Sequence, residues 1–285
     1  MNFRIITDSG CDFTDQQYKD LGVAYAPLSV LFKGEVLDNL NDPADLKNFY
    51  DGMRGGEMPT TSAVNPDGWV RIMKPILDAG EDILCLAFDS GISTTYQSAV
   101  IASKEMMEYY PDRTIRVVDT LCATLSQGLL LMKACQKREE GMGLDDLTQW
   151  VEDNKMNFAH WLTVDDLNHL KRGGRVSATT AFFGGMLGIK PIIHVDDEGH
   201  LITMHKVRGR KASMEYVAKQ LGDTCIDLDT VAIAHGDCLE DAQALEKILK
   251  EQYGVKNVII GYVGGVIGAH TGPGVLILCF AANKR

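Results

Sequence analysis

Short apolar runs alternate with helix-like stretches along most of this chain, and this alternation constrains the fold more than any other feature. In the first half the runs cover residues 3–7, 24–32, 82–88 and 114–118, and each is followed by a helix-like segment. Strands that alternate with helices are typical of βαβ units, whose strands lie parallel. Because the runs are mainly apolar throughout, they predict a sheet covered on both faces.

The pattern changes after about residue 160. Residues 190–209 contain two strand-like runs joined by Asp-Asp-Glu-Gly, which predicts an antiparallel hairpin. Further helices and strands follow, including apolar runs at 230–235, 257–262 and 274–281. We therefore predict two α/β domains, residues 1–160 with a mainly parallel sheet and residues 161–285 with a mixed sheet.

Composition excludes several classes of protein. The 285 residues are 45% hydrophobic and 24% charged, as in globular proteins, and their net charge of -11 argues against binding nucleic acid or anionic membrane. No signal peptide and no spanning helix are evident. The seven cysteines form no CxxC pair, so we expect reduced thiols in a cytoplasmic protein.

Cofactor and metal motifs are missing from the sequence. It contains no G-x-x-x-x-G-K-[ST] and no G-x-G-x-x-G before a helix, so an ATP-consuming or NAD-dependent enzyme is poorly supported. No His, Cys and Asp cluster has the spacing of metal ligands. We expect no cofactor and no metal.

Polar, glycine-containing loops follow four of the predicted strands, at residues 7–12, 89–96, 119–128 and 234–237. Ligands of open parallel sheets bind beyond the carboxyl ends of the strands. Each loop alone is typical of ordinary turn chemistry, since Asp, Ser and Gly are what turns need. Four such loops together favour a binding site.

Ser93 lies in the most specific of these loops, "DSGISTTYQSA", between a strand and a helix. The free N–H groups and the dipole of the helix N-terminus favour an anion there. Three roles remain open: a nucleophile, a hydrogen-bond donor to a bound anion, or an N-cap residue. The loop is one residue short of the G-x-S-x-G nucleophile elbow, because Thr95 takes the place of the last glycine.

Other stretches allow both a structural and a binding role. Thr60, Thr61 and Ser62 lie in a predicted loop between helices, as an N-cap or as ligand donors. Lys171, Arg172 and Arg175 surround a glycine pair, as a solvated turn or as the site of a carboxylate or phosphate. The run 178–193 is typical of a core, but its glycines also suit the wall of a long apolar cavity.

Two further stretches stand out. Residues 205–211 are strongly basic within an acidic protein, as a solvated face or as a docking patch for an acidic partner or a phosphate. Residues 264–274 contain five glycines around the single His270, and glycines let a loop approach a ligand closely.

The stretches "ITDSGCD", "PTTSAVNP", "SGISTTYQSA", "LKRGGRVS", "KVRGRKAS" and "IGAHTGPG", in this order and spacing, resemble the DegV family. These bacterial fatty-acid-binding proteins serve as the acyl-carrying subunits of fatty acid kinase. The resemblance covers nearly the whole chain and implies two α/β domains with the ligand site between them. The sequence departs from the family pattern at two positions, with Thr94 after the site serine and Thr120 after "VVD".

The resemblance also implies roles for individual residues. The carboxylate of a long-chain fatty acid would be held by Thr61, Ser62, Ser93 and His270, with Arg172 nearby. A buried carboxylate needs such donors, because an unpaired charge costs several kcal/mol. The acyl tunnel would be lined by Phe182, Phe183, Met186, Leu187 and Ile189. The protein itself would not be a catalyst but would present the ligand to a separate ATP-dependent kinase, which docks at Lys206, Arg208 and Arg210.

Two other hypotheses come from the residues alone. The first is a serine hydrolase with Ser93 as nucleophile, His270 as base and Asp237 as orienting residue, in the chain order of α/β-hydrolases. The second is an interaction protein without a ligand, in which the hydroxyl-rich loops are only turns.

Overall fold

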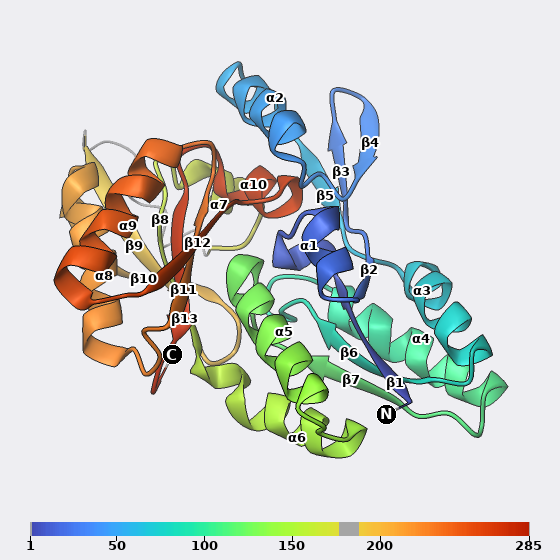
Figure 1. The fold of residues 1–285 in the computed structure, drawn as a ribbon. Helices are drawn as coiled ribbons and strands as arrows, with labels where there is room; N and C mark the ends of the chain where they lie inside the picture. The colour runs from blue at the N-terminus through green and yellow to red at the C-terminus, as the bar shows by residue number, and fades with distance from the viewer. Residues whose placement is uncertain (1, 177–187, 285) are drawn as a thin grey trace.

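A parallel sheet of four strands forms the core of the N-terminal half (Figure 1). The computed structural model describes residues 2–176 and 188–284. The strand order is β2-β1-β6-β7, and every pair is parallel, as predicted from the continuous apolar runs. The strands are β1 (Phe3–Asp8), β2 (Ala24–Ala26), β6 (Asp82–Ala87) and β7 (Ile115–Asp119).

Helices cover both faces of this sheet because successive strand residues point to opposite sides. Ile6 and Ile83 share a buried cluster with residues of α3 and α4, whereas Ile5 and Leu84 share another with residues of α5. The helices of this half are α1 (Asp15–Asp20), α2 (Pro43–Arg54), α3 (Pro66–Asp78), α4 (Thr95–Tyr109), α5 (Thr124–Glu139) and α6 (Leu144–Asn154).

A mixed sheet of six strands, in the order β10-β9-β8-β13-β11-β12, forms the core of the C-terminal half. Its β9–β10 pair is the predicted antiparallel hairpin. The predicted boundary after residue 160 falls inside β8, so the exact division of the chain stays a prediction. The strands are β8 (Phe158–Thr163), β9 (Ile189–Val195), β10 (Leu201–Arg208), β11 (Thr230–His235), β12 (Asn257–Tyr262) and β13 (Leu276–Ala281).

Helix α5 lies between the two large sheets and joins them in one apolar cluster. Leu125 and Leu130 of α5 pack in this cluster with Leu84 of the first sheet and Leu162 and Ile277 of the second. The other face of the mixed sheet packs against α8 (Arg210–Thr224) and α9 (Leu239–Tyr253). The two α/β halves, parallel and mixed, confirm the predicted fold class.

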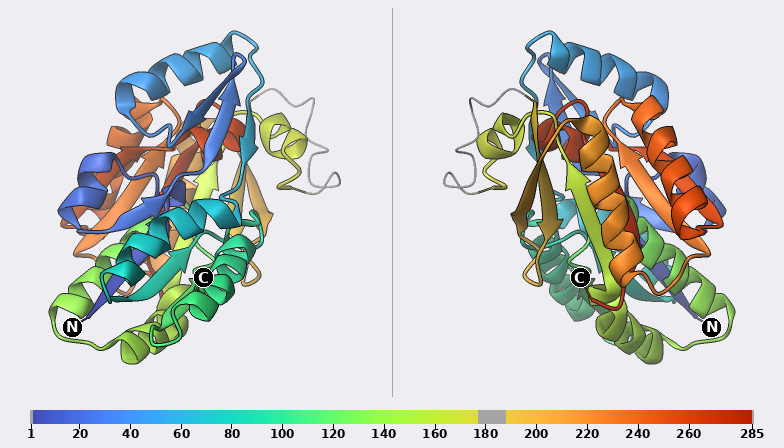
Figure 2. Two further views of the ribbon diagram at one scale, coloured as in Figure 1. Left: turned by 90° about the vertical axis from the view of Figure 1, so that its right-hand side faces the viewer. Right: turned by 90° about the vertical axis from the view of Figure 1, so that its left-hand side faces the viewer.

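A third, small sheet differs from the sequence prediction. Residues 24–32 were expected to form one strand, but the chain breaks at Pro27 and Leu28, after which β3 (Ser29–Phe32) leaves the parallel sheet. The strand order of the small sheet is β4-β3-β5, with β4 (Glu35–Asp38) and β5 (Thr60–Ser62). The expected loop around Thr61 is therefore a strand. Figure 2 shows this sheet and α2 above both large sheets.

Two further α-helices among the described residues are short, α7 (Asn168–Arg172) and α10 (Gly265–Thr271). The glycine-rich stretch around His270 was expected to be a loop, but most of it folds into α10. Its glycines permit close packing, since a Cβ at Gly268 would lie 2.5 Å from the Tyr50 hydroxyl oxygen of α2. Within residues 2–176 and 188–284, no helix combines the length and hydrophobicity needed to cross a bilayer.

Candidate functional site

A cavity of about 510 Å³ lies between the two halves of the molecule. This volume is within the range of about 300–1,000 Å³ that is typical of small-molecule sites. The parallel half contributes residues around Phe88 and Ser93, the small sheet contributes β5, and the mixed half contributes residues of α7 and α10. The structure thus supports a site between the domains.

One side of the cavity is polar. Four of the five predicted carboxylate-binding residues line it, namely Thr61, Ser62, Ser93 and His270. Thr61 and His270 come from different halves, and the Thr61 hydroxyl lies 2.8 Å from Nε2 of His270. Since a hydroxyl both donates and accepts, this pair forms a hydrogen bond in either neutral tautomer of the imidazole.

Ser93 is half-buried just before α4, as the sequence predicted. Its hydroxyl oxygen accepts a hydrogen bond from the backbone N–H of Thr95 at 3.2 Å, and it lies 2.9 Å from the Thr95 hydroxyl. Thr95 is fully buried and its hydroxyl also accepts from the N–H of Val64 at 3.4 Å. The residue that replaces the elbow glycine therefore anchors the loop between β5 and α3.

His270 is held in an environment that keeps it neutral. Burial, followed by the nearby positive charge of Arg175, lowers the pKa of His270 to about 4. Its ring packs on the backbone of Gly173, where a Cβ atom would lie only 2.1 Å from Nδ1. A glycine is therefore required at position 173 for the imidazole to reach this position. At neutral pH the ring can donate one N–H to an anion.

The cation nearest this histidine differs from the predicted one. Arg172 is exposed at the end of α7, where its guanidinium lies 2.8 Å from Nδ1 of His169, and it does not line the cavity. Arg175 does line it, and its Nε donates to the carbonyl of Ile92 at 3.1 Å. Both arginines belong to the same basic motif, but the prediction placed Arg172, not Arg175, near the carboxylate.

The remaining walls of the cavity are largely apolar. They include the side chains of Leu28, Phe88, Ile92, Leu170, Leu201 and Ile267. The sequence analysis named none of these as lining residues. Of the predicted tunnel residues, Ile189 is half-buried at the start of β9 and does not line the cavity. Phe182, Phe183, Met186 and Leu187 lie outside the described residues.

The predicted docking residues lie at one edge of the mixed sheet. Lys206 and Arg208 are exposed on β10, which is an edge strand. Arg210 is different, because its guanidinium is half-buried and forms ion pairs with Asp241 at 2.9 Å and Asp165 at 3.7 Å. The structure therefore leaves two of the three side chains accessible to a partner.

The structure does not assemble the triad of the hydrolase hypothesis. Asp237, the predicted orienting residue, pairs with Arg54 of α2 and accepts a 3.4 Å hydrogen bond from Tyr262. Nε2 of His270 contacts Thr61, and the Ser93 hydroxyl contacts Thr95. Each member of the proposed triad thus has a partner outside it, and the arrangement of a nucleophile, its base and an orienting carboxylate is not formed.

The comparisons with known proteins agree with this fold. The family model described as "Uncharacterised protein, DegV family" matches residues 2–283. The chain belongs to the DegV family. A DegV domain-containing protein of Clostridium perfringens is 42% identical over 99% of this chain and 98% of its own length.

Two solved structures resemble the DegV protein described here over nearly its whole length. DegV of Bacillus subtilis, a fatty acid binding protein, is 28% identical with a TM-score of 0.84, over 99% of this chain and 100% of that one. The Streptococcus pneumoniae fatty acid kinase B3 protein, loaded with linoleic acid, is 20% identical with a TM-score of 0.85, at the same coverage. At that identity the second likeness concerns the fold.

Proposed function

We propose that this protein binds a long-chain fatty acid in the cavity between its halves, with the carboxylate at Thr61, Ser62, Ser93 and His270. The observation that carries the proposal is that these four residues line one cavity together with many apolar side chains, and that the Thr61 hydroxyl lies 2.8 Å from Nε2 of His270. Arg175 takes the place of Arg172 as the nearby positive charge. The fatty acid binding named for the solved DegV structure of Bacillus subtilis supports the same class of ligand.

The physical chemistry of the cavity fits an amphiphile. A chain of about 16 carbons, buried at ~0.8 kcal/mol per methylene, gives a gross gain of about 12 kcal/mol, from which ordering costs are subtracted. The carboxylate must exchange its water shell for hydrogen bonds from the hydroxyls of Thr61 and Ser93 and from the imidazole. Hydrogen bonds to a charged group contribute about 1.5–3 kcal/mol each.

The first test is mass spectrometry of lipid extracted from the purified protein, with titration of the delipidated protein by palmitate and oleate. We expect one fatty acid per chain and saturable binding. The variant Thr61→Val with His270→Gln should bind at least about tenfold more weakly, because two donors to a charged group are lost. Thr148→Val, which removes a hydroxyl from α6 outside the cavity, is the matched control. An extract without fatty acid, together with no binding in the titration, would refute the proposal.

We further propose that the protein is not itself a catalyst and presents the carboxylate to a separate ATP-dependent fatty acid kinase. Two observations support this part: the shared fold with the S. pneumoniae kinase protein, and the exposed Lys206 and Arg208 on the edge strand of an acidic molecule. Charge complementarity of this kind mainly speeds association and selects the partner.

Reversal of the two charges separates docking from ligand binding. With a bacterial fatty acid kinase and ATP, Lys206→Glu with Arg208→Glu should lower the rate of acyl-phosphate formation by about tenfold, because the encounter loses its electrostatic attraction. The fatty acid content should stay unchanged. Lys219→Glu, an exposed charge on α8, is the control. Loss of lipid from the double variant, or an equal loss of rate in Lys219→Glu, would contradict the docking role.

A further inference from the structure

The small sheet and α2, together residues 29–62, pack on the half of the molecule that contains His270. Val30, Leu46 and Phe49 of this unit share a buried cluster with Ala269, the neighbour of His270 on α10. The same unit contributes Thr61 and Ser62 to the polar side of the cavity. Its position against the mixed half therefore decides whether the two sides of the site meet.

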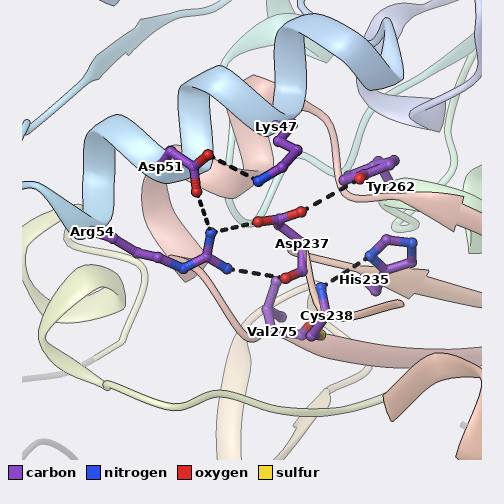
Figure 3. Close-up of polar contacts among 8 residues, drawn as sticks. All are labelled: Lys47, Asp51, Arg54, His235, Asp237, Cys238, Tyr262 and Val275. Atoms are coloured by element: carbon purple, nitrogen blue, oxygen red, sulfur yellow. Dashed lines mark hydrogen bonds and ion pairs between the residues drawn. The ribbon is translucent and has the colours of Figure 1, made fainter. Parts of the chain in front are cut away.

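Two polar links hold α2 to the mixed half. The buried Tyr50 hydroxyl donates to the carbonyl of Val263 at 2.7 Å, just before α10. At the end of α2, the Arg54 guanidinium donates to the carboxylate of Asp237 and, at 3.0 Å, to its backbone carbonyl (Figure 3). Arg54 also contacts Asp51 at 3.0 Å. We call the Arg54–Asp237 pair the clasp.

Asp237 is well placed for such a link. It follows β11 and Gly236, and it adopts a left-handed backbone conformation with φ of 53°. The N–H of Gly236 donates to the carbonyl of Val275 at 2.8 Å, which ties this turn to the chain just after α10. The Asp237 side chain is 15% exposed and that of Arg54 is 42% exposed, so solvent partly screens the ion pair. The clasp thus joins α2 to a hydrogen-bonded turn of the mixed half.

The clasp is also close along the chain to the ligand side of the small sheet. Arg54 is the last residue of α2, and β5 begins at Thr60. Only residues 55–59 separate the guanidinium from the strand that carries Thr61. Thr61 therefore lies one short segment away from the clasp, and its hydroxyl lies 2.8 Å from Nε2 of His270.

From this geometry we propose that Arg54 and Asp237 are positioning residues that hold Thr61 and Ser62 against His270, so that the clasp sets the rate of ligand release. The proposal rests on the function proposed above, because it assumes that the ligand's carboxylate lies between these side chains. Neither residue touches the cavity. They therefore act on the rate of ligand release through Thr61 and Ser62 and not through a contact with the ligand.

The experiment measures dissociation of an anthroyloxy-labelled stearic acid into excess albumin by stopped-flow fluorescence. Arg54→Gln and Asp237→Asn should each raise the dissociation rate by about two- to fivefold, the range for loss of a partly exposed ion pair. The double variant should release no faster than either single variant, because both remove one interaction. Arg54→Lys, which keeps the charge, should be intermediate. Salt should speed release from the wild type and have little effect on Arg54→Gln.

A matched control exists within the same cluster. Lys47 pairs with Asp51 at 2.9 Å, and both residues lie on α2, so Lys47→Gln removes an ion pair within α2 and a longer-range attraction to Asp237 but leaves the hydrogen bonds of the clasp in place (Figure 3). Its release rate should equal that of the wild type. Unchanged rates in Arg54→Gln and Asp237→Asn, or an equal increase in Lys47→Gln, would overturn the proposal.

Failure of the clasp is distinguishable from failure of the proposed function. A wild-type protein that does not bind the labelled acid refutes the function, and the clasp is then tested by hydrogen exchange of the backbone amides of residues 60–62. Faster exchange in Arg54→Gln than in Lys47→Gln supports a positioning role for the clasp. Equal exchange in the two variants contradicts it.

Discussion

Replacing Asp12 with asparagine should stabilise the protein at alkaline pH, which is unusual for loss of a charge. Asp12 is almost fully buried, and its Oδ2 has no hydrogen-bond partner among residues 2–176 and 188–284. Burial is the main reason why the pKa of Asp12 rises from 3.8 to about 7; contacts with the Thr124 side chain and the Gly264 N–H lower it, and the nearby Asp8 raises it. Asparagine also tolerates the left-handed backbone at this position, where φ is 56°.

The magnitude follows from proton linkage. A carboxyl group whose pKa is higher in the folded state contributes stability that is complete below pH 3.8 and is lost as the pH rises through 7. At about 1.4 kcal/mol per pH unit, Asp12 costs the wild type about 2.5 kcal/mol of unfolding free energy between pH 5 and pH 8. Asparagine does not titrate, so this loss should disappear. For a chain of this size the difference corresponds to about 5 °C in melting temperature.

Thermal and urea unfolding at pH 5 and pH 8 test this expectation, with Asp8→Asn as the contrasting variant. Both oxygens of the Asp8 carboxylate accept backbone hydrogen bonds, from Phe88 at 2.7 Å and from Gly10 at 2.9 Å. An amide would turn a donor toward one of these N–H groups, so Asp8→Asn should destabilise the fold by about 1–3 kcal/mol at pH 5. Because burial also raises the pKa of Asp8, to about 6, this cost should be about 1.4 kcal/mol smaller at pH 8. If Asp12→Asn retained the full pH dependence of the wild type, the reasoning about its buried charge would be wrong.

Three further predictions concern the cavity. Gly173→Ala should displace His270 and weaken fatty acid binding at least about tenfold with little loss of stability, because the new methyl group would occupy the position of the imidazole; titration checks this. Arg175→Ala should weaken the same binding severalfold, whereas Arg172→Ala should leave it unchanged, and equal effects would contradict the assignment of the cation. Because the pKa of His270 is lowered to about 4, its contribution to stability is complete above pH 6.5 and is lost as the pH falls through 4. Between pH 6.5 and pH 4, the unfolding free energy of ligand-free His270→Gln should therefore fall by about 2–3 kcal/mol less than that of the wild type, as measured by urea unfolding.

The large sheets were predictable from sequence because burial on both faces leaves a direct signal. The apolar run at 82–88 has no polar alternation, and β6 is indeed covered by helices on either side. The small sheet leaves no such signal. Its strands have three or four residues, and its β3–β5 pairing joins Leu31 to Thr60 across a stretch that contains α2. Sequence patterns of short range do not report a pairing of this kind.

In the candidate site, too, only the residues with a local sequence signal could be predicted. Ser93 was located correctly because a strand that runs into a helix through Gly-x-Ser has a characteristic local pattern. Arg172 and Arg175 could not be separated in this way, since the turn at Gly173 and Gly174 decides which cation reaches the cavity. Gly174 has φ of 71°, and this conformation is not encoded by the charges around it. The carboxylate-binding role of the assembled residues stays a prediction.

Residues 29–62 enter and leave the rest of the molecule at one point, because Ser29 and Ser62 are direct partners in the β3–β5 register. The parallel sheet and its helices resume at α3 with no strand or core helix of their own left inside this segment. The segment is thus an insertion on a two-stranded stem. A short turn could replace it without altering the connections of the surrounding domain. Such an insertion can vary independently of the scaffold, so Thr61 and Ser62 of the cavity lining can change while Ser93 and His270, which belong to the scaffold, stay in place.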